Sequence, residues 1–77
     1  MKNELIKDIR HYLGMTQEEF ADWLGVHYST IALTEANYRG VSDKLASKIA
    51  LKFDVTDAEF LAFRERRAKT QKFFKVN

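Results

Sequence analysis

The chain has 77 residues, of which 45% are apolar, and it contains no cysteine and no proline. This length allows one domain, and the apolar content favours one compact core over a disordered chain. The absence of cysteine excludes a disulfide framework and a cysteine-ligated zinc site. We expect no membrane segment, because no apolar run approaches the roughly 18 residues that span a bilayer, and we expect no secretory signal.

The formal net charge of +2 is unevenly distributed along the chain. Residues 1–63 carry seven Lys/Arg and ten Asp/Glu, whereas residues 64–77 carry six Lys/Arg and only Glu65. We therefore predict a domain over residues 1–63 and a basic extension, a helix or a tail, over residues 64–77. The domain itself does not attract an acidic partner through its net charge.

Apolar residues at helical spacing predict two helices in the first part of the chain. The first helix begins near Asn3, a candidate N-cap, and ends at Gly14, which suits the left-handed position after a helix. The second helix begins at a predicted capping box of Thr16 and Glu19. It ends at Gly25, where a Cβ would strain the turn.

The third and fourth helices follow the same rules. The third is expected over residues 28–36, with Ile31 inward and Asn37 as a left-handed cap in place of glycine. Ser42 is a candidate N-cap for the fourth helix, with Asp43 in its first turn. The apolar face of the fourth helix is formed by Leu45, Ala46, Ile49, Ala50 and Phe53.

The segment Thr-Asp-Ala-Glu at residues 56–59 is interpreted as a second capping box, which opens a fifth helix. Phe60, Leu61 and Phe63 form the apolar side of this helix before the pattern gives way to charged residues. The fold class is therefore predicted to be all-α. The two short helices within residues 16–36, joined by a turn that contains glycine, have the helix-turn-helix layout.

The pattern TQEEFA…LGV…STI…E, with Ile6, Ile9 and Arg10 before it and residues 45–55 after it, resembles the XRE/Cro family of phage-repressor-like domains. The resemblance covers about residues 3–61. It implies a five-helix lambda-repressor-like bundle whose third helix enters the DNA major groove. It also implies an ion pair between Arg10 and Glu35 that holds the recognition helix.

The resemblance further implies which residues contact DNA. A glutamine that opens the second helix contacts a phosphate, and residues of the third helix and the following loop contact bases or phosphates. The residues at these positions are Gln17, His27, Tyr28, Ser29, Thr30, Ala32, Leu33, Asn37 and Arg39.

The third helix departs from the family pattern. Leu33 replaces a usually basic or polar reader, Thr34 stands at a usually aliphatic inward position, and His27 replaces a small hydroxyl residue. Arg39 is the only Lys/Arg between residues 11 and 43. These departures motivate an alternative function, a protein-binding module such as an antirepressor, whose partner would contact Trp23, Tyr28 and Leu33. Trp23 can also be a half-buried residue that covers the edge of the bundle.

The preferred interpretation is a sequence-specific transcriptional regulator, of phage or mobile-element repressor type, in the cytoplasm of a bacterial or phage-infected cell. We expect a palindromic double-stranded operator bound by a homodimer, and no enzymatic activity, cofactor or metal. The dimer contacts are expected around Tyr38, Val41, Phe63, Phe73 and Phe74. For Phe73 and Phe74, packing on the chain's own bundle and a basic arm on DNA remain alternatives.

Overall fold

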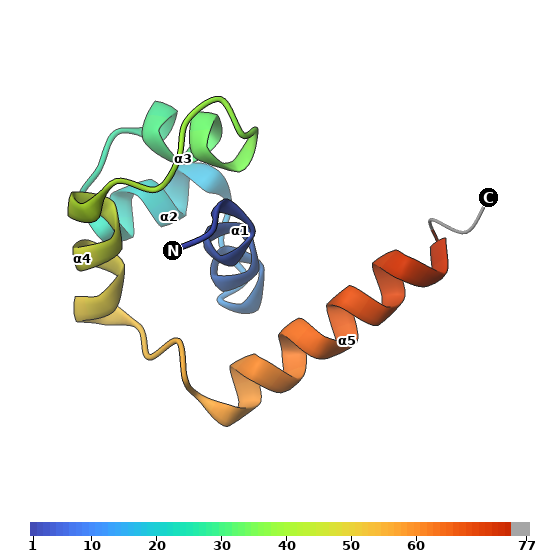
Figure 1. Ribbon diagram of the computed structural model, residues 1–77. Coiled ribbons are helices and arrows are strands. Elements are labelled where there is room, and N and C mark those ends of the chain that lie inside the picture. The colour runs from blue at the N-terminus through green and yellow to red at the C-terminus, as the bar shows by residue number, and fades with distance from the viewer. Residues whose placement is uncertain (75–77) are drawn as a thin grey trace.

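The computed structural model describes the backbone of residues 1–74 and the side chains of residues 1–70, and this part of the chain is all-α (Figure 1). The elements are α1 (Asn3–Tyr12), α2 (Gln17–Leu24), α3 (Tyr28–Glu35), α4 (Asp43–Lys52) and α5 (Ala58–Phe74). The predicted five-helix fold with a helix-turn-helix in α2 and α3 is therefore confirmed. None of the described helices is long and apolar enough to cross a bilayer.

One hydrophobic core receives side chains from all five helices. It consists of Ile6, Ile9, Phe20, Ala21, Leu24, Ile31, Leu45, Ile49 and Phe60, each at most 4% exposed. The small side chain of Ala21 lies in this core, on the helix that packs against α3. The helix-turn-helix pair is therefore an integral part of the packed domain.

The first three helices end in the same way. Gly14, Gly25 and Asn37 follow α1, α2 and α3 with φ angles of 69°, 71° and 65°. After each of them, the next backbone N–H donates to the carbonyl five residues back, at 2.9–3.1 Å. This is the Schellman arrangement, in which a left-handed residue satisfies the last carbonyls of a helix. The predicted left-handed positions at these three residues are thus confirmed.

The predicted N-terminal cap of α2 is confirmed, whereas that of α1 is wrong. Thr16 and Glu19 form the predicted capping box, in which the Glu19 N–H donates to Thr16 Oγ1 at 3.1 Å and the Thr16 N–H donates to Glu19 Oε1 at 2.8 Å. Asn3, by contrast, is not the N-cap of α1. Lys2 occupies that position without a side-chain cap, and Asn3 is the first helical residue.

The second predicted capping box, at residues 56–59, is wrong. The carboxylate that caps α5 belongs to Asp57, whose Oδ2 accepts from the Phe60 N–H at 2.9 Å. The backbone N–H and the hydroxyl of Thr56 both donate to Asp54 instead. Asp and Thr are both good N-caps, so two adjacent candidates compete and the geometry of the Asp54 turn decides between them.

The apolar faces of α4 and α5 are narrower than predicted. Ala50 is exposed, and Ala46 and Phe53 are only partly buried. Leu61 is 47% exposed, although Phe60 beside it is fully buried. A domain of this size has one small core, so residues at the margins of an amphipathic stripe stay at the surface.

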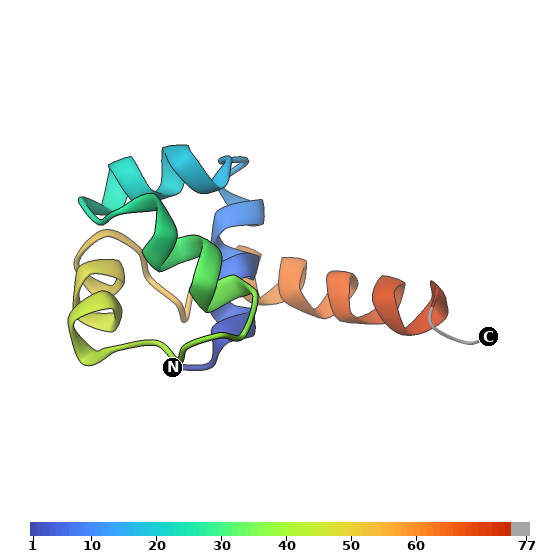
Figure 2. The same cartoon turned by 90° about the horizontal axis from the view of Figure 1, so that it is seen from above.

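Helix α5 is the longest helix and projects away from the other four (Figures 1 and 2). It continues through residue 64 without a break, and the division after residue 63 stays a prediction. Arg64 and Arg67 anchor it to α1 through Asp8, at 2.8 and 3.4 Å. The side chains of Phe73 and Phe74, which we expected at a dimer contact, lie outside the described residues.

Candidate nucleic-acid interface

Two polar residues in and just before α3, both of which depart from the family pattern, have local partners. Thr34 is fully buried, and its hydroxyl donates to the Thr30 carbonyl oxygen at 2.6 Å, so no polar atom is left unsatisfied at this inward position. His27 is the N-cap of α3, and its Nδ1 accepts from the Ser29 N–H at 3.1 Å. His27 Nδ1 also lies 2.8 Å from Ser29 Oγ, which orients both side chains at the start of α3.

An ion pair connects α1 to the end of α3. Arg10 Nε and Nη2 donate to the two carboxylate oxygens of Glu35, at 2.7 and 2.8 Å. The Glu35 side chain is only 4% exposed and that of Arg10 13% exposed. Arg10 Nη1 also donates to the Met15 carbonyl oxygen at 3.0 Å. Bidentate geometry gives such a pair both strength and a fixed orientation, so the C-terminal turn of α3 is held against α1.

Gln17 extends this ion pair to the start of α3. Its Nε2 donates to Glu35 Oε1 at 3.2 Å, and its Oε1 accepts from the Tyr28 hydroxyl at 3.3 Å. We call Arg10, Glu35, Gln17 and Tyr28 the polar chain. Because it includes the first residue of α2 and both ends of α3, it fixes how α3 lies across α2.

The polar chain also sets the protonation of Glu35. Burial alone raises the pKa of this carboxyl, but the hydrogen bonds from Arg10 and Gln17, together with the charge of Arg10, outweigh burial and lower the pKa below its usual 4.5. The pKa of His11 is lowered from 6.5 by burial and by the nearby charges of Arg67, Arg10 and Lys7.

These two shifts predict a loss of stability in acid. Folding favours the charged form of Glu35 and the neutral form of His11, so each group stabilises the fold above its unfolded pKa and loses that contribution as the pH falls through its folded pKa. We expect the melting temperature to decline gently below about pH 6.5 and more steeply below about pH 4.5. The pKa values of Glu19 and Asp54 are also lowered, by their hydrogen bonds with Thr16 and Thr56, so these groups contribute to the lower decline as well. Thermal melts across this range should show that Glu35→Gln reduces the lower decline and His11→Gln removes the upper one. An unchanged lower decline in Glu35→Gln would contradict the role of Glu35.

The residues predicted to contact DNA lie in three groups, at the starts of α2 and α3, within α3 and in the loop after α3. Gln17, His27, Tyr28 and Ser29 are at the starts of α2 and α3, where Tyr28 is 46% exposed. Arg39 and Asn37 are exposed in the loop after α3. Thr30, Ala32 and Leu33, which are also predicted to contact DNA, lie within α3 and are partly buried. They retain accessible surface, but less than a fully exposed helix face would offer.

Trp23 does not form an exposed partner surface. Its ring stacks on Phe20 with a centroid distance of 5.9 Å, and Lys52 Nζ lies 5.2 Å from the ring centroid. The residue packs partly buried against the core. These contacts agree with a tryptophan that covers the edge of the bundle, and they weaken the argument that Trp23 serves a protein partner.

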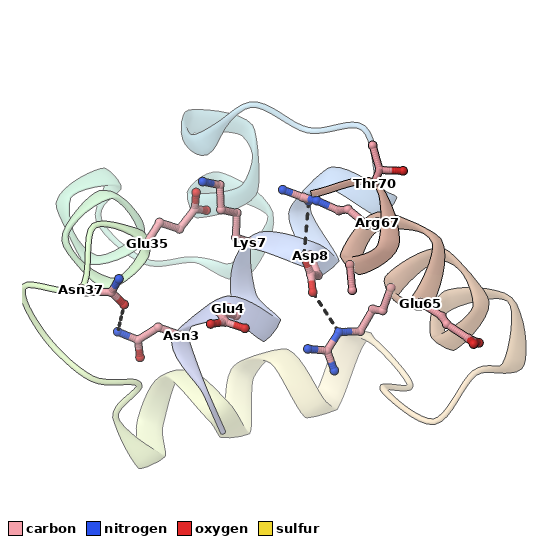
Figure 3. A pocket seen from close by; sticks show the side chains of 11 residues that line it. Asn3, Glu4, Lys7, Asp8, Glu35, Asn37, Glu65, Arg67 and Thr70 are labelled. Carbon is pink, nitrogen blue, oxygen red and sulfur yellow. Dashed lines mark hydrogen bonds and ion pairs between the residues drawn. The ribbon is translucent and has the colours of Figure 1, made fainter. Parts of the chain in front are cut away.

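Sequence reasoning missed two sets of contacts. Lys48 and Lys52 of α4 donate to the carbonyl oxygens of Gly25 and Trp23 at the end of α2, where cations interact favourably with the helix dipole. The i, i+4 spacing of the two lysines predicts that they share one face of α4, but it does not predict that this face lies against the end of α2. Asn3 contacts the loop after α3, beside a depression between α1 and α5 that also contains the Asp8 ion pairs (Figure 3). The described residues contain no cluster that could hold a metal ion.

Comparison with known proteins supports the architecture described above. The model of the XRE-type helix-turn-helix family matches residues 6–60, which include most of α1, all of α2, α3 and α4, and the start of α5. The comparisons with curated proteins and with solved structures gave no match. Since the family match covers more than half of the chain and includes both motif helices, the chain belongs to the XRE-type helix-turn-helix family of DNA-binding regulatory domains.

Proposed function

We propose that this protein is a sequence-specific transcription regulator, of phage or mobile-element repressor type, that places α3 in the DNA major groove. The polar chain is the observation that carries the proposal. It holds α3 across the start of α2 with hydrogen bonds of 2.7–3.3 Å. Ser29, Ala32 and Leu33 of α3 are not part of the polar chain, so their side chains are not used in the hydrogen bonds that hold the helix in place. A recognition helix needs this kind of fixed frame, because base edges are read at hydrogen-bond distances.

Phosphate contacts would come from residues near both ends of α3. Gln17 keeps one Nε2 hydrogen beyond its bond to Glu35, and the positive end of the α2 dipole lies beside it. Arg39 supplies a cation beyond the opposite end of α3. These contacts would position the protein on the duplex, and α3 would select the sequence.

Base selection by α3 would depend on hydroxyl and apolar groups. The helix has neither Arg nor Lys, so it lacks the side chains that make the strongest contacts with guanine. Tyr28 and Ser29 carry hydroxyls, and Ala32 and Leu33 suit the methyl group of thymine. We therefore propose an operator with A·T pairs opposite Ala32 and Leu33, and a contribution from DNA shape.

A salt titration tests the proposed function directly. Binding to random duplex DNA, measured by fluorescence anisotropy at several salt concentrations, should give a log–log slope of several units, since each neutralised phosphate releases counterions. Selection of bound sequences from a random pool would then identify the operator. A slope near zero would contradict DNA binding.

A second candidate, a protein-binding module on the same scaffold, is motivated by the uncharged surface of α3 with Tyr28 and Leu33. Leu33→Ala separates the two functions. For a DNA reader, the variant should lose preference at one or two base positions in the selection experiment while its affinity for random DNA stays nearly unchanged. If every base preference is retained, Leu33 does not read DNA, and the second candidate gains support.

We further propose that the protein binds a palindromic operator as a homodimer, because one α3 covers only a few base pairs. The half-sites would be about 34–36 Å apart, one turn of DNA. Tyr38, 82% exposed beside the recognition helix, is the described residue that best fits such a contact. A footprint over one unrepeated half-site would contradict this arrangement.

A further inference from the structure

We propose that Asn3 is a positioning residue that holds Arg39 in place for its phosphate contact. The inference rests on the proposed DNA-binding function and concerns the loop of residues 36–42, which joins α3 to α4. The proposed interaction connects Asn3, the first residue of α1, to Arg39, the only Lys/Arg between residues 11 and 43.

The side-chain amide of Asn3 makes two bonds across the fold. Its Nδ2 donates to Asn37 Oδ1 at 3.1 Å and to the Arg39 carbonyl oxygen at 2.8 Å. Figure 3 shows Asn3 and Asn37 facing each other from α1 and from the end of α3. A single group can donate to both acceptors at once only if it carries two hydrogens. The amide of asparagine has two, whereas the hydroxyl of serine has one and an ionised aspartate has none.

The loop has few hydrogen bonds that hold its backbone, although Val41 packs partly buried against the core. The Schellman end of α3 stops at the bond from the Tyr38 N–H to the Leu33 carbonyl oxygen, and the next bonds are those of the Ser42 cap. Among the described residues, the bond from Asn3 is the only hydrogen bond that reaches residues 39–41. Gly40 adds conformational freedom directly after Arg39.

Other roles for Asn3 do not account for these bonds. The residue is not the N-cap of α1, and its side chain makes no cap bond. Arg39 is exposed and forms no ion pair with a described residue, so its own side chain does not fix the loop. A phosphate contact from an unrestrained loop would lose affinity to the ordering of that loop. The hydrogen bond from Asn3 to the Arg39 carbonyl oxygen orders the backbone of Arg39 before DNA binds.

The test is a double-mutant cycle on binding to random duplex DNA, with Asn3→Ala, Arg39→Ala and the double variant. We expect Asn3→Ala to weaken binding about 3- to 10-fold, as expected for a contact of about 1 kcal/mol, and to flatten the salt slope toward that of Arg39→Ala, which should be lower by about one. In the Arg39→Ala background, Asn3→Ala should have almost no further effect. Ser47→Ala, a neutral truncation at an exposed site of α4, is the matched control and should bind like the parent protein.

A second measurement does not depend on DNA. Backbone ¹⁵N relaxation of the free protein should show increased mobility of residues 39–41 in Asn3→Ala and not in Ser47→Ala. Equal effects of Asn3→Ala with and without Arg39, or an unchanged loop, would overturn the positioning role while leaving DNA binding intact. If the parent protein shows no salt-dependent DNA binding, the proposed function fails, and this inference fails with it.

Discussion

Replacing Arg10 by methionine should lower the free energy of unfolding by about 2–3 kcal/mol, because the change strands a buried carboxylate. The Glu35 side chain is 4% exposed, and without Arg10 only Gln17 still donates to it. The Met15 carbonyl oxygen loses a donor as well. For a domain of this size we expect the melting temperature at pH 7 to fall by roughly 10–20 °C, measured by circular dichroism.

Two further variants make this prediction specific to burial. Lys69→Met breaks the ion pair between Lys69 and Glu65, whose side chains are 77% and 71% exposed, and should shift the melting temperature by no more than about 2 °C. The double variant Arg10→Met, Glu35→Met should recover part of the lost stability, since neither charge is then left alone. Equal melting temperatures for Arg10→Met and the parent protein would show that the pair contributes nothing.

Introducing a carboxylate on the outer side of α3 should abolish DNA binding while the fold is retained. Ala32 is partly exposed, and glutamate is a good helix former, so Ala32→Glu should melt close to the parent protein. Within the major groove its charge would face the phosphates and lose its hydration. Like-charge contacts at an interface cost several kcal/mol, so we expect at least about 100-fold weaker binding by fluorescence anisotropy.

The matched control for Ala32→Glu is Leu51→Glu. Leu51 is 86% exposed in the last turn of α4, and its substitution changes the net charge of the chain by the same amount. We expect Leu51→Glu to bind DNA within about threefold of the parent protein. If the two glutamate variants weaken binding equally, net charge explains the loss and α3 does not enter the groove.

Local signals predicted most of the fold. Gly14, Gly25 and Asn37 marked the helix ends because a left-handed residue after a helix is a short-range requirement that few residues meet. The starts of α1 and α5 were harder to predict. Asn3, Thr56 and Asp57 are all acceptable caps in isolation, and contacts with residues far away or in the neighbouring turn determine which of them caps a helix.

The same distinction applies to the candidate site. The ion pair of Arg10 with Glu35 followed from the family pattern, whereas the bonds of Gln17 to Glu35 and Tyr28 depend on the crossing of α2 and α3. The partial burial of Leu33 was not predictable from an eight-residue helix in which apolar residues lie on all sides. Contacts between distant residues, such as that of Asn3 with the loop after α3, left no pattern in the sequence.

The placement of Trp23 gives the molecule an intrinsic optical reporter. It is the only tryptophan, it stacks on Phe20, and Lys52 of α4 lies over its ring. Its fluorescence emission therefore depends on whether α4 remains docked on the helix-turn-helix. The edge-on aromatic contacts of Tyr12 with Phe60 and Phe63 instead join α1 to α5. Tryptophan emission therefore follows the docking of α4, whereas helical ellipticity follows the helix content of all five helices. Different midpoints of the two signals during denaturation would show that α4 detaches in a separate step from the loss of helix.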